Sequence, residues 1–129
     1  MSVLVISAIL LVLIFTLGVA AFFDRFDTLD TESKRVSLAL AEACGNIAMV
    51  KIAQNAGYTG NETITVDTGK FCKICTVSLA RSTISIVTRA LYGSAYTNLQ
   101  IQGALSPSDI SITRWSEMGT YTGPTCLIP

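Results

Sequence analysis

The chain has 129 residues, and its 9 Lys and Arg side chains balance 9 Asp and Glu side chains. This length accommodates one modest domain, and the balanced charge leaves no electrostatic footprint for nucleic acid, so no nucleic-acid partner is predicted. The sequence contains no histidine, no glycine-rich phosphate loop and no recognisable nucleophile constellation. We therefore predict no enzymatic activity, no cofactor and no metal site.

Residues 1–23 form an apolar segment without a charged side chain. A helix of about 20 such residues covers the roughly 30 Å hydrocarbon core of a bilayer, so a single-span membrane anchor is one interpretation. A cleaved signal peptide is another, because Gly18, Ala20 and Ala21 are small residues after an apolar run. No Lys or Arg precedes that run, which argues against the signal peptide.

A helical pattern continues over residues 24–57 without a proline. Apolar side chains recur there every three or four residues and are expected on one helix face: Val36, Leu40, Cys44, Ile47 and Val50. Lys34 and Arg35 are expected largely away from that face, and Asn55 to Gly57 are a typical helix stop.

A single helix of about 55 residues is too long to be covered by so small a chain, so its apolar half needs lipid or identical neighbours. The residues predicted to form a filament core with such neighbours are Val3, Val5, Ile9, Leu10, Leu13, Phe15, Leu17 and Gly18. Gly18 is either a point of flexure or a small residue at a helix contact, since glycine weakens a helix interior.

After residue 60 the pattern changes to alternation rich in Thr, Val and Ile, which is typical of strands. The expected strands are 62–67, 72–79, 83–91, 96–101 and 109–115, and the final stretch is expected to be irregular. Short connections favour an antiparallel meander packed on the helix. The predicted fold class is α+β, organised as an apolar helix (1–23), its amphipathic continuation (24–57) and a β-sheet head with a C-terminal tail (58–129).

Four cysteines, Cys44, Cys72, Cys75 and Cys126, predict structural disulfides. A redox site is disfavoured because the C-x-x-C lies in a strand-like stretch, and a zinc site because histidine is lacking and the cysteines are scattered. Cys72 and Cys75 are expected on opposite faces of a strand, so they do not pair with each other. Two pairings remain, and we favour Cys44 with Cys75 and Cys72 with Cys126.

The apolar N-terminal helix, the segment ALAEACGNIAMVKIAQNAGYTGNETITV, the CTV at Cys75 and the closing ISITRWSEM resemble small pilin-like proteins of candidate-phylum bacteria. More broadly, the order of elements is similar to that of type IV pilins and pseudopilins. The resemblance implies a subunit that resides in the inner membrane before assembly. A prepilin peptidase and other assembly machinery would then act on it, and it would polymerise with copies of itself into an extracellular filament on the cell surface. Val5 departs from the family, in which a glutamate is common at the fifth mature position.

Three functions follow as hypotheses. The chain is expected to be the major pilin of a filament used for attachment, motility or DNA uptake. The alternatives are a minor pseudopilin of a secretion or pilus machine, or a single-span membrane protein whose head binds a partner. Asn61 is a candidate glycosylation site, because Asn61, Glu62 and Thr63 match the sequon.

Overall fold

The computed structural model describes residues 2–123 and 126–128. One helix, α1, spans Ser2–Gln54, and five strands follow: β1 (Glu62–Asp67), β2 (Lys70–Ala80), β3 (Thr83–Tyr92), β4 (Ala95–Ser106) and β5 (Asp109–Met118). The chain divides into two compact units, Met1–Glu32 and Ser33–Pro129, and we call the second unit the head. The predicted α+β class, with a long N-terminal helix and an antiparallel sheet joined by disulfides, is confirmed.

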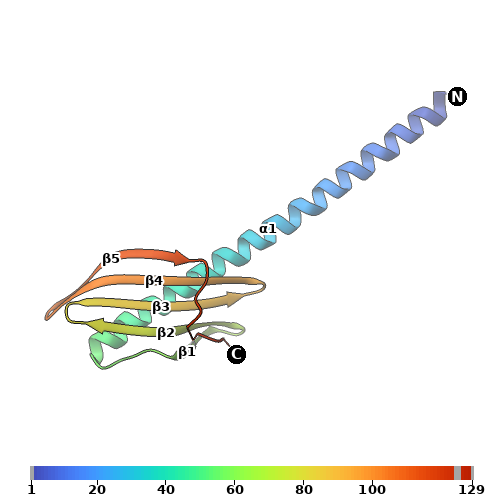
Figure 1. Cartoon of the computed structure of the whole chain (residues 1–129). Coiled ribbons are helices and arrows are strands. Elements are labelled where there is room, and N and C mark those ends of the chain that lie inside the picture. The colour runs from blue at the N-terminus through green and yellow to red at the C-terminus, as the bar shows by residue number, and fades with distance from the viewer. Residues whose placement is uncertain (1, 124–125, 129) are drawn as a thin grey trace. The chain divides into compact units, whose positions relative to one another are not determined.

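The five strands form one antiparallel sheet in the order β1-β2-β3-β4-β5, which is a simple meander (Figure 1). Each strand pairs with the next along the chain, because turns of two residues leave no length for a crossover. The expected starts of β1, β3 and β5 match the structure. The described residues after β5, which are 119–123 and 126–128, form no regular element, as expected.

Strand β4 is longer than predicted, since it continues from Ile101 to Ser106. This extension contains Gly103, which weakens a strand signal in the sequence. In the structure a Cβ at Gly103 would lie only 2.6 Å from the backbone oxygen of Ser111 on β5, next to a shift in the β4–β5 register. The glycine therefore permits a close backbone approach at this bulge and does not end the strand.

The main core lies between one face of the sheet and the part of α1 that belongs to the head. The helix contributes residues from one of its sides: Leu40, Ala41, Cys44, Ala48 and Ile52. The sheet contributes Ile74, Ile84, Ile86 and Ile101, each nearly or completely buried. Val50 was expected in this stripe but is 56% exposed. At about 100° per residue it lies far around the helix from Cys44, whereas Ala48 and Ile52 stay on the buried side.

Gly45 sets how closely α1 approaches the sheet. A Cβ at this position would lie 2.3 Å from Ile101 Cδ1 and 3.6 Å from the ring of Trp115. Gly45 is thus retained inside a helix, despite its poor helix propensity, because the helix packs directly on β4 and β5 there.

Candidate functional site

The N-terminal unit presents an exposed apolar helical surface over residues 3–23. Every side chain from residue 3 to residue 32 is exposed, including all eight residues predicted for a filament core. Val3, Phe15 and Leu17 are 76%, 74% and 70% exposed. The helix is long and apolar enough to cross a membrane, so it is a candidate membrane anchor or signal sequence. An apolar surface of this extent marks a site of contact with protein or lipid.

The hydroxyl groups of Ser7 and Thr16 in the apolar segment are hydrogen-bonded within the helix. Ser7 Oγ donates to the carbonyl oxygen of Val3 at 2.8 Å, and Thr16 Oγ1 donates to that of Leu13 at 3.0 Å. A polar group without such a partner is costly away from water. These two side chains are therefore compatible with burial in lipid or between packed helices.

Gly18 lies within the continuous helix α1, and no atom lies within 4 Å of the position a Cβ would take. Packing within the chain therefore does not require a glycine here. The two sequence hypotheses, flexure and close contact with a neighbouring helix, both stay open as predictions.

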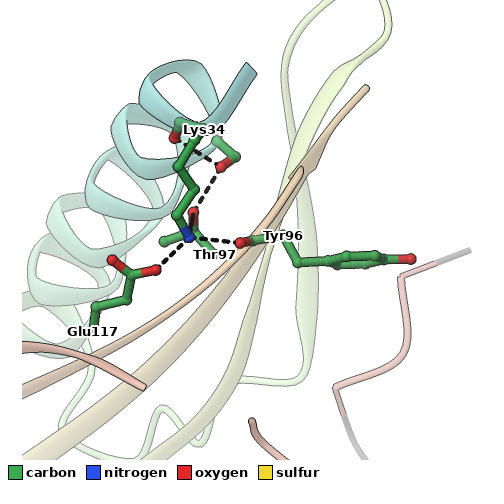
Figure 2. Close-up of polar contacts among 5 residues, drawn as sticks. Lys34, Tyr96, Thr97 and Glu117 are labelled. Atoms are coloured by element: carbon green, nitrogen blue, oxygen red, sulfur yellow. Dashed lines mark hydrogen bonds and ion pairs between the residues drawn. The ribbon is translucent and has the colours of Figure 1, made fainter. Parts of the chain in front are cut away.

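Within the head, Lys34 joins α1 to the sheet. Figure 2 shows its side chain extending from the helix toward β4, where Nζ donates to the carbonyl oxygen of Tyr96 at 2.8 Å and to Thr97 Oγ1 at 3.1 Å. The same ammonium group pairs with the carboxylate of Glu117 on β5. Ser37, which is completely buried, shares a 2.6 Å hydrogen bond with Thr97.

The expectation that Lys34 lies away from the packed face was therefore wrong. The sequence carries no signal for this contact, because its partners lie more than 60 residues further along the chain. The contact exists only once the meander brings the ends of β4 and β5 together.

A second polar cluster joins the last turn of α1 to the start of β1. Lys51 forms an ion pair with Glu62, and the hydroxyl of Tyr58 donates to the same carboxylate at 2.9 Å. The hydrogen bond from Lys51 and, to a smaller extent, the hydrogen bond from Tyr58 lower the pKa of Glu62. Burial and, to a smaller extent, the hydrogen bond to Glu62 raise the pKa of Tyr58. The cluster connects the end of α1 to the start of β1.

The two disulfides are Cys44–Cys72 and Cys75–Cys126. Disulfide formation by all four cysteines is as predicted, but the favoured pairing was wrong. Cys72 faces α1 and lies in the main core. Cys75 lies on the opposite face of the sheet, in a separate small cluster with Val87 and Cys126.

The observed pairing follows from the face of β2 that packs on α1: Cys72 is on that face and Cys75 is on the other. The pairing of β2 with β3 shifts between Ile74 and Thr76, so Cys75 is an extra residue in a bulge. Before the bulge Cys72 and Ile74 face the helix, and after it Val77 does so. Alternation correctly separated the two cysteines but did not determine which one faces α1.

Basic side chains also hold the C-terminal segment against the outer face of the sheet. Arg89 Nη1 donates to the carbonyl oxygen of Cys126 at 2.8 Å, and Lys73 Nζ donates to that of Leu127 at 3.0 Å. Lys73 and Arg89 are direct neighbours across β2 and β3. Adjacent like charges on neighbouring strands repel each other. The hydrogen bonds to the two carbonyl oxygens therefore offset the unfavourable pairing of Lys73 with Arg89.

Asn61 is exposed and has a left-handed backbone conformation, with φ of 57°, just before β1. The side chain is accessible for modification, and its glycosylation stays a prediction. Among the described residues, no cluster of His, Cys, Asp or Glu is arranged to hold a metal ion.

A groove of about 680 Å³ lies at the end of the head where α1 ends. One wall is formed by the last turns of the helix, including Met49, Ile52 and Ala53. The other is formed by the β4–β5 hairpin, including Leu105 and Ile110. The lining is mainly apolar and the groove is open to solvent.

No family model matches the chain, and no curated protein or solved structure matches it.

Proposed function

We propose that the chain is the structural subunit, or major pilin, of a type IV pilus-like extracellular filament that polymerises through its N-terminal helix. The observation that carries the proposal is the exposure of every side chain from residue 3 to residue 32 on a helix whose first part is apolar. Burying apolar surface is favourable by about 25 cal/mol per Å². Side-by-side packing of such helices from many copies removes this surface from water.

The construction of the head supports the same role. Its sheet is held to α1 by the Cys44–Cys72 disulfide, a continuous core and the Lys34 contacts. A sheet that is fixed in this way to its helix resists separation from the helix when force is applied along a filament. Disulfides are typical of small domains outside the cytoplasm, which agrees with an extracellular location.

A membrane-anchored head that binds a partner is the second candidate, because the same helix is long and apolar enough to span a bilayer. The two functions differ in what surrounds the helix in its final state. An anchor remains in lipid, whereas a filament subunit leaves the membrane and contacts other copies.

The first test is electron cryomicroscopy of material sheared from producing cells, with intact-mass analysis of its subunit. The proposal expects thin helical fibres of this chain, with a mass four hydrogens below that of the reduced chain because of the two disulfides. Recovery of the chain only as dispersed subunits in the membrane fraction would contradict the filament and favour the anchor.

Phe15→Ala separates lipid contact from helix packing. Alanine remains compatible with a membrane helix, but truncating a Phe that is buried between helices costs about 3–5 kcal/mol. We expect unchanged membrane insertion with at least tenfold fewer fibres. The matched control is Leu127→Ala in the head, which changes a side chain of the same 74% exposure and should leave fibre yield unchanged. Equal fibre yields for the two variants would argue against helix packing as the basis of assembly.

A further inference from the structure

The two compact units carry opposite net charges. Residues 1–32 contain four acidic side chains and one basic side chain, which leaves three negative charges. Residues 33–129 contain eight basic and five acidic side chains, which leaves three positive charges. The balanced total of the chain therefore conceals a charge separation between its units.

The negative charge is concentrated in one exposed stretch of α1 that we call the collar, residues 22–32. Phe22, Phe26 and Leu29 follow one another at spacings of four and three, so they share one side of the helix, and they are 61%, 56% and 59% exposed. Phe22 and Phe26 are in edge-to-face contact, with ring centroids 4.7 Å apart. Asp30 lies on one flank of this aromatic side, and Asp27 lies further around the helix.

The groove at the end of the head matches the collar in its apolar walls, whereas the charged side chain in its lining, Asp109, has the same sign as the collar. Its walls are mainly apolar, and Val50 and Ala53 at the helix side are exposed. The β2–β3 turn adjoins the opposite wall, because Leu105 N–H donates to the carbonyl oxygen of Ser82 at 2.8 Å. The neighbouring Arg81 is exposed and forms no ion pair within the part of the chain that the structure describes.

We propose that the collar of one copy docks in the groove of a second copy, with its aromatic side against the apolar walls and its carboxylates toward Arg81. This inference rests on the proposed filament and names one of its contacts. The unlike charges of the two units favour such an association between copies.

The collar and the groove are different surfaces, so the contact is head-to-tail. Each copy has one of each surface, and an interface of this kind gives an open helical filament when its rotation does not close into a ring. The charge separation thus gives the filament a polarity in addition to the packing of apolar helices, which are nearly uniform in chemistry.

Photo-cross-linking in assembled fibres of the full chain tests the contact. Benzoylphenylalanine is introduced at Ala53, in the groove, or at Ser78, an exposed control position on β2. Irradiation of the Ala53 fibres should give covalent dimers on a denaturing gel, and mass spectrometry should place the link within the collar, residues 22–32. The Ser78 probe should not cross-link to that segment.

Fibres that give no dimer from position 53, or a dimer linked to any other segment or protein, would overturn the docking while leaving the filament in place. An absence of fibres from the unmodified chain would overturn the filament itself and the docking with it. The two failures are therefore distinguishable by imaging the same preparations.

Charge variants supply an independent readout. Arg81→Glu should lower fibre yield at least threefold in low salt, and Asp30→Lys combined with it should restore the yield. Asp109 also lines the groove, so Asp109→Asn, which removes a negative charge, should not lower the yield. Unchanged yield in Arg81→Glu, or a loss in Asp109→Asn equal to it, would contradict the proposed orientation.

Discussion

The two disulfides offer a quantitative test of how the head is held together. Cys44–Cys72 closes 28 residues and Cys75–Cys126 closes 51 residues. In the chain-entropy account, loops of these sizes contribute about 3.6 and about 4.1 kcal/mol, so loop length alone makes the second bond the more stabilising. The structure predicts the opposite order.

The difference lies in what each bond holds in the folded state. Cys44 and Cys72 are completely buried and join α1 to the sheet, so their removal leaves the constrained elements packed as before. Cys126 lies in a segment whose small cluster contains Val87, Met118 and Tyr121. Without its bond this segment can leave the sheet and regain conformational freedom, which offsets much of the loss.

We therefore expect Cys44→Ala/Cys72→Ala to lower the free energy of unfolding by about 3–4 kcal/mol, and Cys75→Ala/Cys126→Ala by less than about 2 kcal/mol. Urea unfolding of the full chain in detergent measures both. The fluorescence of Trp115, the single tryptophan, is a suitable probe because its ring lies beside Gly45 on the helix. A larger loss for the second double variant, or a loss below about 1 kcal/mol for the first, would refute the reasoning.

Two further predictions concern polar contacts of the head. Thr88→Val should lower the free energy of unfolding by about 0.5–1.5 kcal/mol, because the buried hydroxyl donates to the carbonyl oxygen of Ala41 on α1. Thr83→Val, at an exposed position, is the control. Equal urea midpoints for the two variants would contradict this prediction. Glu62→Gln should reduce the loss of stability on acidification. Since Lys51 holds the pKa of Glu62 below its ordinary value, the stabilisation is fully present above about pH 4.3 and is lost as the pH falls through the lowered pKa. Urea midpoints at pH 7 and pH 3 measure this, and an unchanged difference between them in the variant would exclude the contribution.

Sequence patterns identified most of the elements of this protein. The uncharged stretch over residues 1–23 predicts an apolar helix because no other regular structure satisfies the backbone of so long an apolar run. The alternation after residue 60 predicts five strands, and short turns between them leave the antiparallel meander as the natural topology. The type and order of these elements depend on residues that are close together in the sequence, so the sequence alone predicts them.

Contacts between distant residues were decided by the tertiary structure. Which of Cys72 and Cys75 meets the helix depends on which face of β2 packs on α1. The attachment of Lys34 to Thr97 depends on how the start of β4 packs beside α1. The two surfaces of the proposed contact differ in the same way. The acidic and aromatic residues of the collar can be read from the sequence, whereas the groove exists only where the end of α1 and the β4–β5 hairpin come together. Local propensity specifies elements, but register and packing specify which side chains share a site.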